Sequence, residues 1–273
     1  MPEGDTIFRA ARTLNRALAG RTVTRFDSVF SRLTRIDEDE RIPGRTIERV
    51  DARGKHLLIW FSGDLVLRTH MRMHGSWHIY RPGERWQRPR ADMRIVIGTS
   101  DYEAVAFSVP VAELTSAREL ERAEPMRVLG PDILAGQFDA AEVVRRIEAM
   151  RDVEIGDALL DQSAVAGIGN IFKSESLFAA RVNPFTRVGE LSRADMARIV
   201  DAARRLMRAS AIQRPAGASV YGRAGRPCRR CGTIISRRKQ GEHARITYWC
   251  ARCQAVSPKP GSGGGGQTHG RAE

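Results

Sequence analysis

The first apolar pattern along the chain has the spacing of an amphipathic helix. Its members, which share one helix face, are Ile7, Ala11, Leu14 and Leu18. Asp5 stands where a side chain can cap the start of this helix, and Gly20 stands where a glycine can end it. We therefore predict a helix over residues 5–19.

From residue 21 to residue 115 the apolar residues come in short runs separated by Gly, Asp or Pro. The runs read HLLIWF, LVLRTH, GSWHIY, MRIVIG and YEAVAF, and they are rich in Val, Ile and aromatic residues. Such punctuated runs are typical of the strands of a β-sandwich or a barrel. The stretch PGERWQRPR, residues 82–90, has the composition of a polar loop.

The pattern changes again at VLGPDILAG, residues 128–136, whose Gly and Pro content indicates a linker between domains. Helical periodicity then returns, and the predicted helices cover residues 138–150, 154–161, 170–180 and 192–210. A connection rich in Gly, Pro and Ala occupies residues 211–225. The last residues, 257–273, are of low complexity and are predicted to be disordered.

The 273 residues carry a formal net charge of +13, from 45 basic and 32 acidic residues. This excess indicates a polyanionic partner, most simply nucleic acid, although a generally basic proteome would give the same sign. The lysines are only Lys55, Lys173, Lys239 and Lys259. Nearly all of the positive charge is therefore arginine, which suits bidentate contacts to phosphate or reflects codon bias in the host.

No apolar run reaches the length of about 18 residues that a membrane-spanning helix needs. The first residues also lack the basic-then-apolar pattern of a secretory signal. We therefore expect a bacterial cytoplasmic protein, associated with the nucleoid, that has no membrane partner.

All of the cysteines lie near the carboxyl end, as two Cys-x2-Cys pairs. They are Cys228, Cys231, Cys250 and Cys253. Two such pairs bring four thiolates into tetrahedral geometry around one Zn²⁺, and a redox pair is the alternative. Because sulfur takes every ligand position, no position remains for a reactive water, and we predict one structural zinc ion.

Two apolar stretches between the cysteine pairs, TIIS and RITYWC, are predicted to form a β-hairpin. The loop between them, residues 237–245, is strongly basic. A basic hairpin tip fixed by zinc can grip a phosphate backbone, and a solvated loop is the alternative interpretation.

A glycine-containing turn, GIGN, leads into the helix predicted from residue 170. Backbone N–H groups at a helix N-terminus bind phosphate, and Asn170 could cap the helix or contact phosphate itself. Many helical hairpins contain glycine only to turn the chain, so the motif alone leaves both interpretations open.

The chain start, Met-Pro-Glu, can carry a reactive amine. Removal of a methionine that precedes a small residue would make Pro2 the first residue, with a secondary amine of pKa roughly 8. A substantial fraction of this amine is unprotonated at neutral pH, which favours Schiff-base chemistry. Glu3 stands beside it and can move protons if burial raises its pKa.

These separate features resemble one family of bacterial DNA repair enzymes, the formamidopyrimidine-DNA glycosylase and endonuclease VIII family. The matching stretches are MPEGDT, RGKHL, HMRMHGSW, LGPDIL, LLDQSAVAGIGNIFKSE and VYGRAGRPCRRCG…RITYWCARCQ. They cover nearly the whole chain up to residue 254 and occur in the order of the family.

The resemblance implies an α+β multidomain fold. An N-terminal β-sandwich with flanking helices would be followed by a helix–two-turn–helix bundle and a four-cysteine zinc finger, with damaged DNA in the cleft between the two halves. The expected boundaries are residues 1–127 for the catalytic sandwich, 128–136 for the linker, 137–220 for the helical domain, 221–256 for the zinc finger and 257–273 for the tail. We expect a monomer acting on duplex and also single-stranded DNA.

The resemblance also implies a mechanism. The damaged base would be flipped out of the duplex, Pro2 would attack C1′ of the deoxyribose and expel the base, and β,δ-elimination would cut the strand. Glu3 would move protons on the sugar, and Lys55 would contact a phosphate near the lesion. The expected DNA-contacting residues are His70, Asn170 and Arg245, and those expected to fill the gap left by the base are Arg72, Met73 and His74. A buried core position is the alternative for Met73.

The chain departs from the family pattern in three places. Thr6 stands where many members have Glu, residues 100–114 lack the Arg and Phe pair of the 8-oxoguanine branch, and the 208–221 connection lacks that branch's aromatic loop. The last two departures favour the endonuclease VIII branch and oxidised pyrimidines over 8-oxoguanine and formamidopyrimidines.

Two functions outside this assignment remain as alternatives. A catalytically inactive zinc-dependent protein that binds damaged DNA would keep the charge and the cysteines but would not need Pro2 and Glu3. A metal-dependent nuclease would need an acidic cluster that holds Mg²⁺, and the sequence shows none.

Overall fold

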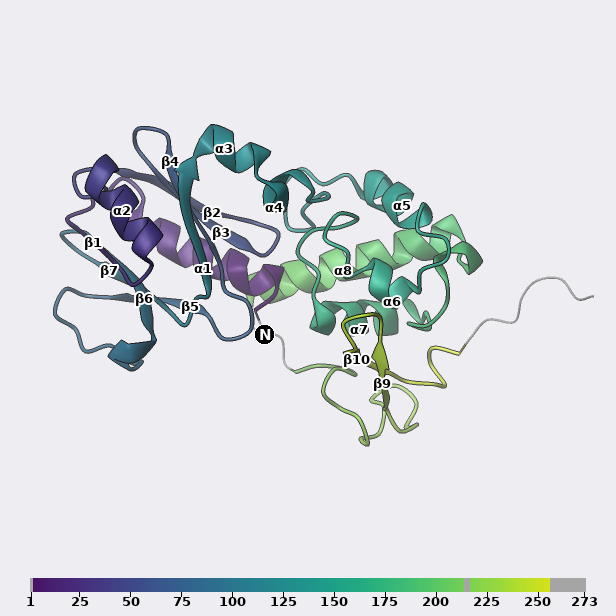
Figure 1. Cartoon of the computed structure of the whole chain (residues 1–273). Helices are drawn as coiled ribbons and strands as arrows, with labels where there is room; N and C mark the ends of the chain where they lie inside the picture. Colours follow the sequence, from purple (N-terminus) through teal and green to yellow (C-terminus); the bar gives the residue numbers. More distant parts are fainter. Residues whose placement is uncertain (1, 214–216, 256–273) are drawn as a thin grey trace, which may run out of the picture.

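The computed structural model describes residues 2–213 and 217–255 of the chain. The predicted disordered tail, residues 257–273, lies outside the described residues. Figure 1 shows two parts placed side by side: the sheets with α1 and α2 form one, and helices α5 to α8 with the β9–β10 hairpin form the other. The chain start lies between them. In the described residues, no helix is long and apolar enough to cross a membrane.

Two antiparallel four-stranded sheets face each other in the first part, as the sandwich prediction required. One has the strand order β1(Arg25–Ser28), β6(Met93–Gly98), β7(Glu103–Phe107), β5(Ser76–Tyr80); the other has the order β2(Ile47–Arg53), β3(His56–Phe61), β4(Leu65–His70), β8(Val111–Ser116). Leu57 and Ile59 of β3 point into the same core as Ile95 of β6. Leu58 faces the other way and packs with Leu120 and Met126. Because β3 is covered on both faces, its sequence is a continuous apolar run.

Helix α1(Gly4–Leu18) forms where the apolar spacing predicted it and packs Ile7, Leu14 and Leu18 into the sandwich core. The prediction that Asp5 caps this helix is wrong. Glu3 is the N-cap residue and makes no side-chain capping bond, while Asp5 lies in the first turn. Its carboxylate instead accepts a hydrogen bond from Ser210, which lies far along the chain. Local sequence cannot show such a partner.

Helix α2(Ser31–Glu40) lies in the stretch that we predicted to contain only strands. Its sequence, SRLTRIDEDE, buries Leu33 alone, so it has no apolar stripe for periodicity to detect. Two further short helices follow the sandwich, α3(Ala117–Arg122) and α4(Glu124–Arg127), and α3 begins with a capping box made by Ser116 and Glu119.

The second part is built from helices around its own core. Its elements are α5(Ala140–Glu148), α6(Ile155–Ala158), α7(Asn170–Ala180), the 3-10 turn η2(Val188–Glu190) and α8(Arg193–Ile212). The predicted helices match α5, α7 and α8 closely, whereas α6 is a single turn. Val144, Ile168 and Ile199 represent the shared core. Phe8 of α1 also packs against it, so α1 joins the two parts.

The cysteine segment holds the hairpin β9(Ser236–Gln240) and β10(Arg245–Trp249). The prediction placed the first strand on residues 233–236, which is wrong by about one strand length. Half of the predicted loop is strand, and the turn is confined to residues 241–244. Gln240 decides the register, because its buried amide donates to Glu154 and to the Pro184 carbonyl. That anchoring lies in another element, so the sequence pattern of the hairpin did not reveal it.

Candidate active site

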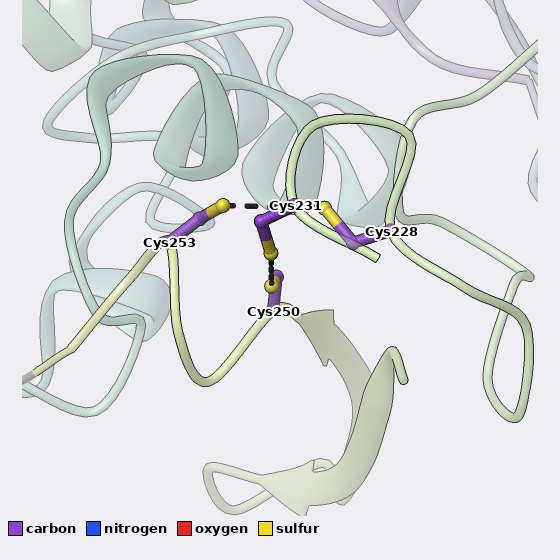
Figure 2. A group of neighbouring side chains, drawn as sticks. All are labelled: Cys228, Cys231, Cys250 and Cys253. Atoms are coloured by element: carbon purple, nitrogen blue, oxygen red, sulfur yellow. Dashed lines mark hydrogen bonds between the residues drawn. The ribbon is translucent and has the colours of Figure 1, made fainter. Parts of the chain in front are cut away.

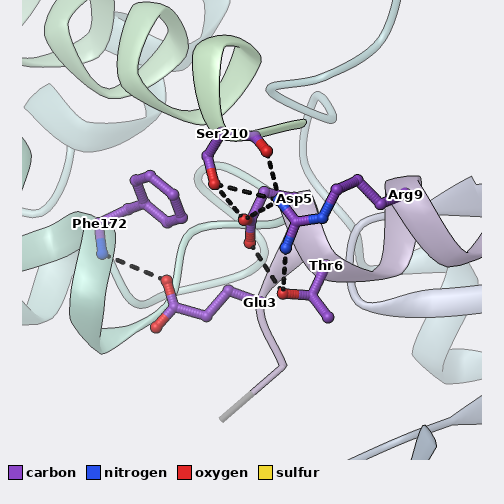
Figure 3. Close-up of polar contacts among 6 residues, drawn as sticks. All are labelled: Glu3, Asp5, Thr6, Arg9, Phe172 and Ser210. Atoms are coloured by element: carbon purple, nitrogen blue, oxygen red, sulfur yellow. Dashed lines mark hydrogen bonds and ion pairs between the residues drawn. The ribbon is translucent and has the colours of Figure 1, made fainter. Parts of the chain in front are cut away.

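Glu3 is seated on the N-terminus of α7. Its side chain is 1% exposed, and its two carboxylate oxygens accept the backbone N–H groups of Ile171 (2.7 Å) and Phe172 (3.2 Å). Figure 3 shows the carboxylate reaching this helix end from the start of the chain. From the sequence, phosphate binding by these amides is one of two open interpretations of the GIGN turn. Glu3 takes two of them instead, because its carboxylate is the nearest anion to the helix dipole.

A glycine makes this seat possible. A Cβ atom on Gly169 would lie 2.3 Å from Cδ of Glu3, which is closer than any real contact. The backbone of the chain start is held as well, because the N–H of Gly4 donates to the carbonyl of Gly167 (3.0 Å). Pro2, half-buried, is therefore fixed between the sandwich and the helical part by its two successors.

The environment of Glu3 favours its protonated form. Burial raises the pKa of this carboxyl above its usual range, and the two backbone N–H groups and Lys55 oppose that shift. A carboxyl with a raised pKa beside an N-terminal amine is suited to take up and release a proton during a reaction.

Lys55 reaches the same place from the turn between β2 and β3. Gly54, at φ +60°, allows this tight turn, and its N–H donates to Asp132 (2.6 Å), which is in the segment that leads into the helical part. Burial chiefly lowers the pKa of Lys55 to about 8, Glu3 raises it, and the nearby Arg245 lowers it. Lys55 is therefore a cation at neutral pH that loses its charge in mild alkali.

An open cavity of about 570 Å³ brings the distant site residues together. Its lining includes Lys55, Gly169, Asn170 and Arg245. A second cavity, of about 640 Å³, shares Asn170 and Arg245 and reaches Arg72 and Met73 of the β4–β5 loop. Residues from four separate stretches of the chain thus line two neighbouring cavities that share Asn170 and Arg245.

Asn170 ties this region to the hairpin. Its Nδ2 donates to the carbonyl of Ile246 on β10 (2.7 Å), so the first residue of α7 and the hairpin are bound directly. Arg245 is exposed at the start of β10. Tyr221 and Tyr248 were not predicted as site residues; their rings meet edge to face, with centroids 5.1 Å apart, and line the second cavity. Only tertiary folding brings these two rings together.

The β4–β5 loop exposes the residues expected to fill the gap left by a flipped base. Arg72, Met73 and His74 are all exposed, and the side chain of Met73 is 50% exposed. The alternative of a buried core methionine is wrong for this position. Met71, two residues earlier, is the methionine that packs in the sandwich core. An exposed, unbranched apolar side chain on a loop is suited to insertion between bases.

His70 ends β4 next to this loop and is neutral at physiological pH. Burial chiefly, with the positive charge of Arg72, lowers the pKa of His70 to about 4. Its Nδ1 accepts the backbone N–H of Arg72 (3.1 Å), which leaves the ring proton on Nε2. His70 can therefore offer a neutral hydrogen-bond donor, but not a positive charge.

The four cysteines converge as the sequence predicted (Figure 2). Their sulfur atoms all lie within 4.8 Å of one another, with Cys231 and Cys250 at 3.5 Å and Cys228 and Cys253 at 4.0 Å. A tetrahedral zinc site with Zn–S bonds of about 2.3 Å has sulfur atoms about 3.8 Å apart. The thiol set therefore fits a zinc ion held by sulfur alone, which is a structural type of site.

Buried polar contacts fix the hairpin against α7. Nζ of Lys173 donates to Oγ1 of Thr247 (2.5 Å), and that hydroxyl donates to Gln240 (2.7 Å). Glu175 of α7 accepts three successive backbone N–H groups, those of Ser219, Val220 and Tyr221, each at 2.9 Å. In the folded protein, the zinc segment and α7 are therefore joined directly by several hydrogen bonds.

Three family models cover almost all of the described chain. They are the formamidopyrimidine-DNA glycosylase N-terminal domain over residues 1–110, the formamidopyrimidine-DNA glycosylase H2TH domain over residues 129–221, and a zinc finger found in FPG and IleRS over residues 225–256.

Named relatives and solved structures give the same picture. The chain is 42% identical to the "Probable endonuclease 8 2" of Streptomyces coelicolor, across 96% of this chain and 97% of that protein. It is 36% identical to the "DNA-(apurinic or apyrimidinic site) lyase Nei2" of Mycolicibacterium smegmatis, across 94% of this chain and all of that protein. A Lactococcus lactis Fpg complex with abasic-site DNA has a TM-score of 0.82 at 21% identity, covering 93% of this chain and 100% of that one.

Proposed function

The chain belongs to the formamidopyrimidine-DNA glycosylase and endonuclease VIII family, whose members are DNA glycosylases and AP lyases of base excision repair, and we propose that this member removes oxidised pyrimidines through a Schiff base on Pro2. The observation that carries the proposal is the seat of the Pro2–Glu3 start on the N-terminus of α7. Lys55, Asn170 and Arg245 line the open cavity that also borders Gly169, the residue just before this helix.

The proposed reaction begins once Met1 has been removed. The unprotonated amine of Pro2 attacks C1′ of the deoxyribose, the N-glycosidic bond breaks, and the base leaves with a proton. The sugar ring then opens: the C1′–O4′ bond breaks, O4′ takes up a proton, and an iminium between C1′ and the Pro2 nitrogen remains, which makes the C2′ proton acidic. Loss of that proton breaks the bond to the 3′ phosphate, a second elimination breaks the bond to the 5′ phosphate, and water returns the free amine. Glu3 carries protons between these steps.

The DNA-contacting roles follow from charge and placement. Lys55 and Arg245 bring positive charge to the cavity next to Glu3, and Asn170 holds the hairpin that carries Arg245. Met73, with Arg72 and His74, would occupy the gap left by the flipped base, and the Nε2–H of His70 would bind the backbone. We further propose one structural zinc, a monomer that acts on duplex and on single-stranded DNA, and a cytoplasmic location at the nucleoid.

The proposed preference for oxidised pyrimidines rests on the short connection after α8, which would have to supply any loop that covers an oxidised purine. Helix α8 ends at Ile212, and the N–H of Ser219 is already bound by Glu175. Only residues 213–218 separate these two anchors, which is too little chain for a long loop over an oxidised purine. Three relatives share the name endonuclease 8 2, those of Streptomyces coelicolor, Mycobacterium bovis and Mycobacterium tuberculosis.

A lesion panel tests the proposal. Duplex and single-stranded oligonucleotides with thymine glycol, 5-hydroxyuracil, 8-oxoguanine or an abasic site would be incubated with the protein and borohydride. We expect a covalent adduct with the two pyrimidine lesions and the abasic site, and much slower reaction with 8-oxoguanine. Faster reaction with 8-oxoguanine would support the other branch, and binding without any adduct would support an inactive damage-binding protein.

Arg245→Ala is expected to weaken DNA binding at all sequences and to lower the slope of log K against log salt by about one, because one phosphate contact is lost. The measurement is fluorescence anisotropy with a duplex carrying an uncleavable abasic analogue. Arg32→Ala, an exposed arginine of α2, is the matched control and should leave the slope unchanged. An unchanged slope for Arg245→Ala would place Arg245 away from the phosphate backbone.

Binding to the same duplex should also weaken as pH rises from 7 to 9. With a pKa of about 8, Lys55 is about nine-tenths charged at pH 7 and about one-tenth charged at pH 9. Affinity should therefore fall by up to about tenfold across this range if the charged form alone binds phosphate. Lys55→Arg keeps its charge throughout and should remove most of this dependence. The same fall in both proteins would assign the titration to another group.

A further inference from the structure

A polar cluster, in which two of the three side chains are buried, joins the start of α1 to the end of α8. We name Asp5, Arg9 and Ser210 the α1–α8 cluster. Oδ2 of Asp5 accepts hydrogen bonds from Oγ of Ser210 (2.5 Å) and Nη1 of Arg9 (2.9 Å). The same Nη1 contacts Oγ of Ser210 (3.2 Å) and donates to its carbonyl oxygen. Figure 3 shows these side chains interlocked beside Glu3.

The cluster lies two residues after Glu3 and connects segments that are distant in sequence. Asp5 and Ser210 are 5% and 3% exposed, so the contact is shielded from water. It is the third of three successive anchors. Glu3 binds the N-terminus of α7, Gly4 binds the carbonyl of Gly167, and Asp5 binds α8. Together these anchors fix both the position and the direction of the chain start.

Thr6 belongs to the same arrangement. Its hydroxyl donates to Oδ1 of Asp5 (3.3 Å) and accepts from Nη2 of Arg9 (3.3 Å). The chain therefore places its first-turn carboxylate at position 5, turned toward α8, and uses position 6 to support it. A cluster that served only stability would be replaceable by apolar side chains, since burying an ion pair costs desolvation energy. Because hydrogen bonds depend on direction, this cluster also fixes the start of α1 in a single orientation.

We propose that the α1–α8 cluster is a positioning device that holds Pro2 and Glu3 in the geometry needed to attack the sugar. The inference rests on the proposed function, because it assumes that Pro2 is the nucleophile. Asp5, Arg9 and Ser210 act through the backbone of the first turn and do not touch the DNA. A displacement of about 1 Å at an attacking atom lowers a rate by about a hundredfold, so this anchoring matters for catalysis.

The cluster also acts on Glu3 through charge. Burial chiefly raises the pKa of Glu3, and the negative charge of Asp5 raises it further. The charged and titratable groups that face Glu3 from the other elements are Lys55 on the β2–β3 turn, Lys173 on α7 and Tyr221 before the zinc segment. Of all these groups, Asp5 alone belongs to the α1–α8 cluster, so its removal should lower the pKa of Glu3.

The test compares Asp5→Asn and Ser210→Ala with wild type and with Arg12→Ala, an exposed position of the same helix. Single-turnover adduct formation with abasic-site DNA would be followed by borohydride trapping at saturating protein between pH 5 and 9. Affinity for an uncleavable abasic analogue and thermal unfolding would be measured in parallel.

We expect both cluster variants to form the adduct about ten to a hundred times more slowly with DNA affinity unchanged. In Asp5→Asn the limb of the pH profile that reports Glu3 should move to lower pH. In Ser210→Ala, which keeps the Asp5 charge, the limb should stay. Arg12→Ala should match wild type.

Wild-type rates in both cluster variants would overturn the inference, as would slower reaction that merely follows lost affinity or lost folding. If Asp5→Asn does not fold, the rate and affinity of Ser210→Ala, which removes one hydroxyl, decide the question. Failure of the proposed function would look different, because wild type itself would then form no adduct.

Discussion

Blocking the amine of Pro2 is expected to abolish adduct formation with abasic-site DNA. Protein with an N-terminal extension that cannot be cleaved should react at least about a thousandfold more slowly than protein with the same extension at the other end, because an amide nitrogen is not a nucleophile. DNA affinity should change far less, since the cationic groups Lys55 and Arg245 remain. The measurement is the rate of borohydride trapping, with mass spectrometry of each protein to establish its first residue.

Glu3→Gln keeps the shape of the side chain and removes its ability to exchange a proton. We expect the rate of base excision to fall by about a hundredfold to ten-thousandfold, which is the usual range for a general acid or base. The amide can still accept from Ile171, but one oxygen acceptor is lost. Thermal unfolding of this variant is the control, because it shows whether loss of one contact between residue 3 and α7 destabilises the protein.

Lys55 is an alternative nucleophile, and an experiment can distinguish it from Pro2. Lys55 also has a depressed pKa of about 8 and lines the same cavity. If the blocked protein still forms an adduct at the wild-type rate and Lys55→Arg does not, the reactive amine is Lys55 and the assignment of Pro2 is wrong. Peptide mapping of the reduced adduct would identify the modified residue directly.

Removing zinc is expected to cost DNA affinity without unfolding the sandwich. Metal binding by four thiolates contributes about 10–16 kcal/mol to the folding of a small zinc segment. The apolar cluster beneath it is small, formed chiefly by Phe178, Val220 and Ile235, and an isolated two-stranded hairpin is marginal in water. Chelation, or Cys228→Ser, should therefore release β9 and β10, and with them Arg245 and the Asn170–Ile246 bond.

The expected loss is about two orders of magnitude in affinity, since a hydrogen bond to a charged group contributes about 1.5–3 kcal/mol and more than one is lost. Hydrogen exchange should show loss of protection in residues 236–249 and retained protection in β3 and β4. The sandwich has its own core, in which no cysteine takes part. Equal loss of protection in both regions would mean that the two parts fold as a single cooperative unit.

The sequence correctly predicted those elements whose residue pattern can be recognised from the segment alone. The apolar spacing of α1, the doubly covered run of β3 and the paired cysteines each show their structure locally. It missed α2, whose helix buries only Leu33, and it misplaced β9, whose register depends on Gln240 meeting Glu154. The α2 segment has no apolar stripe that periodicity could detect, and the contact that fixes β9 lies in another segment.

The candidate site shows the same division. The sequence and the family resemblance named Pro2, Glu3, Lys55, Asn170 and Arg245 one at a time. The structure places the last three along one open cavity and buries Glu3 against the helix end that borders it. Neither the pairing of Tyr221 with Tyr248 nor the neutral state of His70 could be predicted. The first depends on distant strands meeting, and the second depends on burial and on the cations around the ring.

The amino-acid sequence alone determined which chemical groups this protein carries: an amine and a carboxyl at its start, four thiols at metal-binding spacing, and an excess of arginine. Tertiary structure decided which residues surround those groups, and therefore their pKa values and the orientation of their side chains. Glu3 has a raised pKa because folding buries it on α7, and Asp5 holds α8 instead of capping its own helix. Proximity across 205 residues is a property of packing, and no local pattern contains it.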